Sequence, residues 1–175
     1  MYGIGEIIVY GTIGVCEVID VAPSTRPNTS KDILYYTLKP LYQDGVIYIS
    51  VDNDKVFMRR VISREEAEKL IDRIPGIETE FCKTVGRQQL AEHYQTALAS
   101  HDCGDLIELI MSIYNKKIYA QEHHRHLGQL DARYMKRAEE LLYGEFSVAL
   151  EIPKDDVCGY IATRVGQMSG QENKK

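Results

Sequence analysis

The sequence contains no tryptophan and only three phenylalanines among 175 residues. Any contact that needs a large, flat apolar side chain must therefore use phenylalanine, tyrosine, leucine or methionine. The sequence also has no run of about 18 apolar residues, and no basic N-terminal segment followed by an apolar one. We therefore expect a soluble, cytoplasmic protein without a membrane span.

The four cysteines include no CxxC pair and no zinc-ribbon spacing, and GxSxG and phosphate-loop motifs are also missing. These absences remove the common signatures of zinc sites, hydrolases and nucleotide-binding loops. One candidate for a catalytic thiol remains, Cys103 near His101. The competing interpretation is a helix start at which Asp102 and Asp105 satisfy backbone N–H groups.

A basic segment is missing too, since the net charge is -5. Residues 1–60 carry six basic and seven acidic side chains, residues 61–152 carry eleven and sixteen, and residues 153–175 carry four and three. Tight electrostatic binding of nucleic acid by this chain alone is therefore not expected.

The first sixty residues have the composition of a small β domain. Segments rich in Ile, Val, Tyr and Thr and bounded by turn residues predict strands at residues 6–10, 13–21, 33–39 and 46–51. Alternation in the last segment places Ile47, Ile49 and Val51 on the face that packs inward. Tyr48 then lies on the opposite face, which is available for contacts.

From residue 63 onward the pattern is helical. Ser63 followed by Glu66 forms a capping box, and this helix must end before Pro75. Apolar spacing predicts further helices within residues 85–100, 102–121 and 131–150, and a last helix begins at Pro153. In the second of these, Tyr114 and Ile118 are expected beside the core stripe.

Together these patterns predict an α+β protein, in which a small β-sheet domain precedes an all-α domain of four to five helices. The expected boundaries are residues 1–60 for the β domain, 61–165 for the helical domain and 166–175 for a flexible tail.

A polar cluster, "QEHHRH", follows the third helical segment. If it is helical, Glu122 and His126 share a face and could hold a metal, with His123 beside them. A small metal-dependent enzyme is therefore one alternative function. The other interpretation of the cluster is a polar loop before Gly128.

Three segments carry a resemblance to a known family: the start with Gly5 and Gly14, "SVDN" at residues 50–53, and the stretch from Ala138 to Ala149. They resemble the CarD/CdnL family of bacterial transcription regulators, whose N-terminal domain is shared with transcription-repair coupling factors. The family's glycine-punctuated N-terminal pattern matches Gly5, Val9, Tyr10, Gly14 and Val15. "SVDN" at residues 50–53 resembles a strand end of the family. The pattern of its last helices matches Ala138, Leu141, Leu142, Glu145, Phe146 and Ala149.

The resemblance implies a Tudor-like, strongly bent N-terminal sheet that binds a lobe of the RNA polymerase β subunit. It also implies a helical domain that contacts upstream promoter DNA weakly, in a polymerase-dependent way, and modulates the open complex. It further implies a monomer that is not an enzyme, needs no cofactor or metal, and reaches the nucleoid through polymerase. A protein-interaction adaptor without DNA contact is the remaining alternative.

The resemblance also suggests site residues. Val9, Ile47, Tyr48 and Ile49 are expected on or beside the polymerase-binding edge, with Tyr48 near a position where some relatives carry a basic residue. Lys83, Arg87 and Lys117 are the candidate DNA contacts. Arg87 lies close to the position where many relatives carry a wedging tryptophan, and an arginine can enter a narrow minor groove instead.

Overall fold

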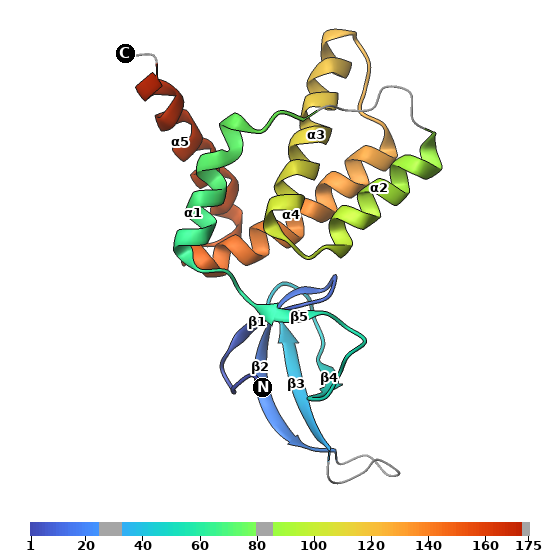
Figure 1. Cartoon of the computed structure of the whole chain (residues 1–175), viewed down its shortest axis with the longest axis vertical. Coiled ribbons are helices and arrows are strands. Elements are labelled where there is room, and N and C mark those ends of the chain that lie inside the picture. The colour runs from blue at the N-terminus through green and yellow to red at the C-terminus, as the bar shows by residue number, and fades with distance from the viewer. Residues whose placement is uncertain (25–32, 80–85, 173–175) are drawn as a thin grey trace. The chain divides into compact units, whose positions relative to one another are not determined.

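The structure, a computed structural model, describes residues 1–24, 33–79 and 86–172, with side chains described as far as residue 168. The chain divides into two compact units, Met1–Ile62 and Ser63–Lys175. The first unit contains an antiparallel sheet and the second contains helices (Figure 1). The predicted α+β class is therefore confirmed.

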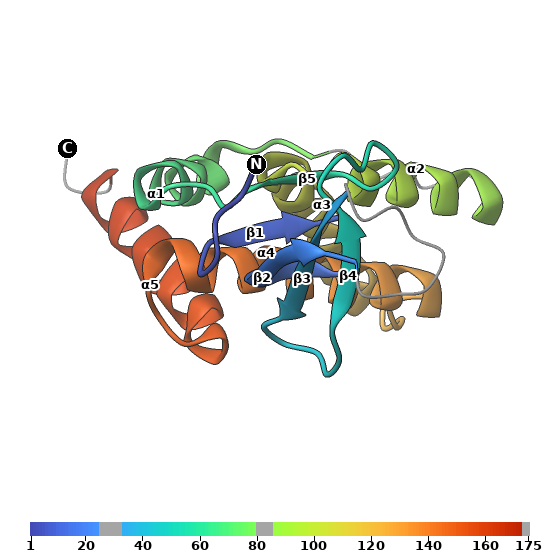
Figure 2. The same ribbon diagram turned by 90° about the horizontal axis from the view of Figure 1, so that it is seen from below.

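The sheet of the first unit has five strands in the order β4-β3-β2-β1-β5, all paired antiparallel. Figure 2 shows these strands from below. Their bounds are β1 Ile7–Tyr10, β2 Gly14–Pro23, β3 Leu34–Pro40, β4 Ile47–Ser50 and β5 Met58–Arg60. The four predicted strands are present, and β5 is an addition that the sequence pattern did not reveal.

Two glycines shape the turn between β1 and β2. Gly11 and Gly14 have φ values of +44° and +98°, a backbone region that other residues rarely adopt. The N–H of Gly11 donates to the carbonyl of Phe57 at 2.8 Å, and a Cβ on Gly11 would lie 3.0 Å from Cγ1 of Val56. Glycine therefore lets the turn approach the segment that leads into β5.

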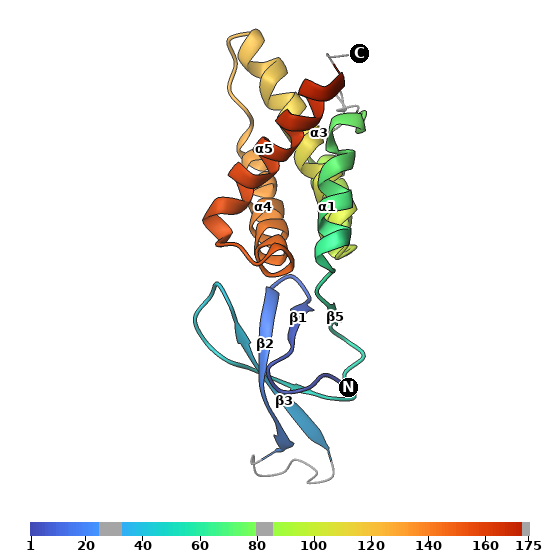
Figure 3. The ribbon, with the colours of Figure 1, turned by 90° about the vertical axis from the view of Figure 1, so that its left-hand side faces the viewer.

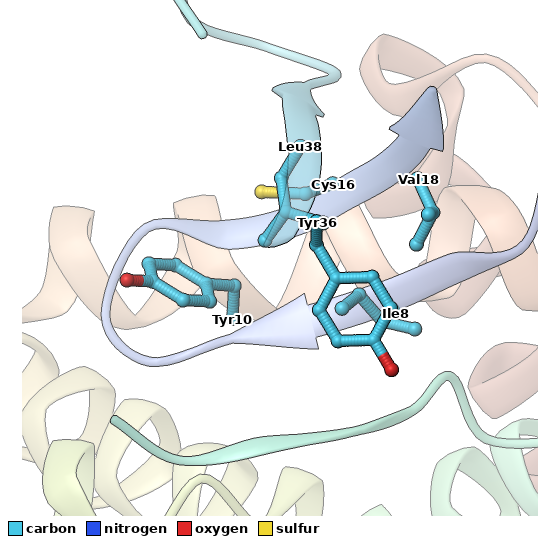
Figure 4. Packing of buried hydrophobic residues seen from close by; sticks show 6 residues of the cluster. All are labelled: Ile8, Tyr10, Cys16, Val18, Tyr36 and Leu38. Atoms are coloured by element: carbon cyan, nitrogen blue, oxygen red, sulfur yellow. The ribbon is translucent and has the colours of Figure 1, made fainter. Parts of the chain in front are cut away.

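The core of the sheet gathers on one face. Figure 4 shows its six buried residues, Ile8, Tyr10, Cys16, Val18, Tyr36 and Leu38. The hydroxyl of the buried Tyr36 accepts a hydrogen bond from the backbone N–H of Tyr2 at 2.8 Å. Ile47, Ile49 and Val51 pack against this core, which confirms the predicted alternation along β4.

The second unit contains five α-helices and one short 3₁₀ helix. Their bounds are α1 Arg64–Arg73, the 3₁₀ turn Ile74–Gly76, α2 Arg87–Ala99, α3 Cys103–Glu122, α4 Gln129–Leu150 and α5 Lys154–Glu172. Helix α4 packs against each of the other four α-helices, and Figure 3 shows it beside α1 and α5. The core of this unit is therefore built around α4.

Two details of the helical unit differ from the expectations. Tyr114 and Ile118 are 45% and 37% exposed rather than packed beside the core, although Ile107, two turns before Tyr114, is buried. Residues 166–172 belong to α5, so the tail expected from residue 166 was too long. The last helix itself was predicted, but the polar residues after Val165 carry too weak an apolar stripe to predict that it continues through them.

Side-chain caps fix the first residues of two helices as predicted. Ser63 accepts a hydrogen bond from the N–H of Glu66 at 3.2 Å, while the Glu66 carboxylate accepts from the N–H of Ser63 at 2.7 Å. Asp102 accepts from the N–H groups of Gly104 and Asp105 at the start of α3. Both caps satisfy donors that the first helical turn leaves unpaired.

We predict that Ser63→Ala destabilises the helical unit by about 1 kcal/mol, because the change removes the cap of α1. Chemical denaturation of the full chain, followed by circular dichroism at 222 nm, measures this free energy of unfolding. The matched control is Ser112→Ala in the middle of α3, where the hydroxyl caps no helix. Equal unfolding free energies for the two variants would contradict the role given to the capping box.

Candidate functional site

Strand β4 is an outermost strand of the sheet, so only one of its two lateral sides pairs with another strand of the sheet in the described part of the chain. Within the described residues β4 pairs with β3 alone, in a register that places Tyr36 opposite Ile49 and Leu38 opposite Ile47. The N–H of Val51 donates to the carbonyl of Leu34 at 2.9 Å. Hydrogen-bonded pairs recur at every second residue of an antiparallel ladder.

This alternation decides which backbone groups face outward. Since Val51 bonds to β3, Ile49 and Ile47 also direct their N–H and C=O groups toward β3. Tyr48, between them, directs its N–H and C=O away from β3. The outer side of β4 is therefore centred on the backbone of Tyr48.

Large apolar side chains surround the same strand. Tyr48 is 59% exposed, and Val46 and Tyr42 in the preceding hairpin are also exposed. Ile47 and Ile49 point to the other face, where they are half-buried against the sheet core. The β4 edge, by which we mean Tyr42, Val46 and the strand β4, combines outward-directed backbone groups with accessible apolar surface.

Val9, which was expected on or beside the polymerase-binding edge, does not lie on an outer strand of the sheet. Val9 is only 6% exposed, and it pairs with Val15 of β2 on one side and with Arg59 of β5 on the other. Strand β1 is therefore internal in the sheet. The pattern of the sequence missed β5, and without β5 the strand β1 would have been an edge.

The candidate DNA contacts differ in their surroundings. Arg87 is the first residue of α2 and is exposed, and no side chain among the described residues caps this helix end at Gly86. The first-turn N–H groups of α2 and the guanidinium of Arg87 therefore lie at one end of the helix. Lys83 lies outside the described residues.

Lys117 is exposed on α3 but lies near a carboxylate of α4. Burial raises the pKa of the Glu139 carboxyl, and the positive charge of Lys117 opposes this shift. The positive charge of Lys117 is thus partly offset by the nearby carboxyl of Glu139. The first turn of α2, in contrast, contains no acidic residue that could offset the charge of Arg87. Of the two candidates that the structure describes, Arg87 is the better placed to contact an anion.

One buried carboxylate on α4 was not predicted from the sequence. Asp131 is 4% exposed, and its Oδ1 accepts a hydrogen bond from the hydroxyl of Tyr94 on α2 at 2.6 Å. Nζ of Lys116 on α3 lies 2.9 Å from each of its carboxylate oxygens. An aspartate in the first turn of a helix is usually exposed, so only its partners from distant parts of the chain identify it as buried.

The proposed metal ligands do not share a helix face. Helix α3 ends at Glu122, and His123 caps it with its ring against Tyr119 and Nδ1 2.8 Å from the Tyr119 carbonyl. The i,i+4 arrangement of Glu122 and His126 that the metal hypothesis required is therefore not formed. Among the described residues no three His, Cys, Asp or Glu side chains are placed to hold a metal ion.

The candidate catalytic thiol is part of the helical core. Cys103 is 2% exposed, and its Sγ lies 3.2 Å from Oε2 of the buried Glu145. Asp102 caps the helix directly before it, as the competing interpretation predicted. Cys103 therefore packs α3 against α4, and its sulfur does not face solvent.

Comparison with known families gives a match on the first unit. The family model of the CarD-like/TRCF RID domain matches residues 2–62, which contain all five strands. The chain carries a CarD-like RNA polymerase-interacting domain. This family is not a family of enzymes, and the predicted resemblance is confirmed for this part of the chain.

Two further findings complete this description. A search of the curated proteins finds no match to it. None of the helices in the described part of the chain is long and apolar enough to cross a membrane.

We predict that iodoacetamide modifies Cys158 in the native protein, while Cys16 and Cys103 react only after unfolding. Cys158 is exposed, whereas burial protects Cys16 and Cys103 and raises the pKa of Cys16 to about 11. A thiol with such a pKa holds almost no thiolate at pH 8. Peptide mass spectrometry after timed alkylation measures this order, and rapid native labelling of Cys103 would contradict its assignment to the core.

Proposed function

We propose that this protein is a transcription regulator that binds the β subunit of RNA polymerase through the β4 edge and contacts upstream promoter DNA through its helical unit. The observation that carries the proposal is the match of residues 2–62 to an RNA polymerase-interacting domain whose sheet ends in the strand β4. In this proposal the DNA contact modulates the stability of the open complex.

The β4 edge is suited to accept a strand of the partner. An extended segment that pairs with an edge strand gains main-chain hydrogen bonds, while pockets for its side chains provide specificity. At β4 the outward backbone groups of Tyr48 supply the hydrogen bonds. The exposed side chains of Tyr42, Val46 and Tyr48 supply apolar surface that such a contact would bury.

The first turn of α2 is the proposed DNA contact. N–H groups at a helix start attract phosphate oxygens, and an arginine beside them can reach a phosphate or a narrow minor groove. Arg87 combines these two features at the end of α2. An arginine does not unstack bases as an indole does, so the proposed contact stabilises DNA by charge rather than by wedging.

The net charge of -5 is compatible with this contact only if polymerase holds the protein near DNA. Tethering turns the second binding step into an intramolecular one, at an effective concentration on the order of millimolar for a short connection. A DNA contact that is too weak to form in free solution can then be occupied.

We predict that Tyr48→Glu lowers the affinity for the isolated β lobe at least about tenfold, equivalent to about 1.4 kcal/mol. The substitution places a carboxylate in the apolar surface that the partner strand would bury, where it has no partner. Titration calorimetry with the full chain measures the affinity, and circular dichroism checks that the variant is folded.

Two variants control this experiment. Tyr48→Phe keeps the aromatic ring and should bind within about twofold of the unmodified protein, because the loss of an exposed hydroxyl costs little. Ile4→Glu introduces the same carboxylate at a 66% exposed position that precedes β1. If Ile4→Glu weakens binding as much as Tyr48→Glu, the contact is not specific to the β4 edge.

We predict that Arg87→Ala weakens protection of upstream promoter DNA in the polymerase complex about fivefold to tenfold, a loss in the range expected for one charged contact. Footprinting at increasing concentrations of the protein measures this change. Lys69→Ala, on the separate helix α1, is the matched loss of one positive charge and should leave the footprint unchanged. An equal response of a free duplex to Arg87→Ala would contradict the tethering argument.

A further inference from the structure

One buried carboxylate of the helical unit joins three helices at one point. Asp131 on α4 accepts the hydroxyl of Tyr94 from α2 and the ammonium group of Lys116 from α3. The carboxylate is 4% exposed, and the side chain of Lys116 retains 26% exposure. We call these three residues the Asp131 cluster.

Helix α2 depends on this cluster more than the other helices do. Tyr94 is the one buried side chain of α2, and the remaining apolar residues of the helix are exposed or half-buried. The Tyr94 ring packs on Tyr134 of α4 with 5.3 Å between the ring centroids. Little other apolar burial therefore fixes the direction of α2, and its attachment rests on the contacts of one tyrosine.

The cluster is attached to α2 two turns after the first residue of that helix. Arg87 precedes Tyr94 by seven residues, which corresponds to about two helical turns and about 10.5 Å along the axis. Two turns also bring Arg87 back to nearly the same side of the helix as Tyr94. A small rotation of α2 about Tyr94 therefore displaces the start of the helix and the guanidinium that it carries.

We propose that Asp131 is a positioning residue, which holds α2 in the orientation that presents Arg87 and the first-turn N–H groups to DNA. This role rests on the proposed contact between α2 and promoter DNA. Asp131 is enclosed by its partners and acts only through Tyr94. When the cluster is broken, α2 spends a smaller fraction of time in the orientation that can contact DNA. The apparent DNA affinity then decreases in proportion to this fraction.

The test uses Asp131→Asn in the full chain, with RNA polymerase and a promoter fragment. The amide keeps the size of the side chain but loses its charge, so the ion pair with Lys116 is lost. We expect faster hydrogen exchange in α2, unchanged exchange in α1 and α5, and an upstream footprint that needs about fivefold more protein. Affinity for the β lobe should stay the same.

Tyr94→Phe provides a graded second variant. It removes the hydroxyl that reaches Asp131 but keeps the ring packed on Tyr134. We expect changes in the same direction as for Asp131→Asn but smaller, about twofold in the footprint. A footprint that is fully normal in Tyr94→Phe together with a lost footprint in Asp131→Asn would overturn the claim that Asp131 acts through Tyr94.

Asp72→Asn is the matched control for general destabilisation. Asp72 on α1 binds Arg164 on α5, with 2.9 Å between Oδ2 and Nη2, and it belongs to the same unit without contacting the Asp131 cluster. The footprints of the two variants are compared at temperatures equally far below the melting temperature of each variant. If Asp72→Asn weakens the footprint as much as Asp131→Asn, the effect is general destabilisation and the positioning role is overturned.

The outcomes also separate this inference from the proposed function. If the unmodified protein protects upstream DNA and Asp131→Asn protects it equally, the DNA contact stands and the positioning role is overturned. If the unmodified protein gives no upstream footprint although it binds the β lobe, the DNA contact fails, and the positioning role fails with it.

Discussion

The proposed interaction depends on the backbone hydrogen-bonding groups of the outermost strands, which have no neighbouring strand of the sheet on one side. Polar backbone groups are costly to bury without a partner, so a strand at the end of a sheet remains a site where another chain can pair. Here the order β4-β3-β2-β1-β5 leaves two such strands. Charged side chains, which commonly protect edges, occur on β5 as Arg59 and Arg60 but are missing from β4, "IYIS".

At the other end of the sheet, β5 decides whether β1 is also an edge. The glycine at position 11 allows the β1–β2 turn to approach Val56 and to bond to Phe57, and this contact brings β5 beside β1. Once β5 occupies that side, Val9 becomes internal. The apolar strand β4 is then the outermost strand that carries no charged side chain. A local backbone requirement at Gly11 thus accompanies the pairing that removes β1 from the strands available to a partner.

The sequence predicted features that depend on neighbouring residues and missed those that depend on distant ones. Alternation along residues 46–51 predicted the inward face of β4, and the capping residues of α1 and α3 were predicted from spacings of two or three residues. The pairing of β5 was not predictable in this way, because its three residues have no apolar alternation and are positioned by β1, about 50 residues earlier. Tyr114 and Ile118 fit a helical stripe, but the stripe cannot show how much of it α4 covers.

The Asp131 cluster shows the same limit for a charged residue. A carboxylate in a first turn is usually a solvated group that interacts with the helix dipole, and only Tyr94 and Lys116 mark this one as enclosed. A carboxylate that accepts a charged and a neutral donor satisfies its hydrogen-bonding capacity, so the burial costs less than for an isolated ion. Because an acidic chain cannot rely on its overall field to attract DNA, any contact it makes must depend on a few correctly placed donors. In the proposed DNA contact, geometry supplies the affinity that charge does not, which is why we assign the attachment of this weakly buried helix a role in that contact.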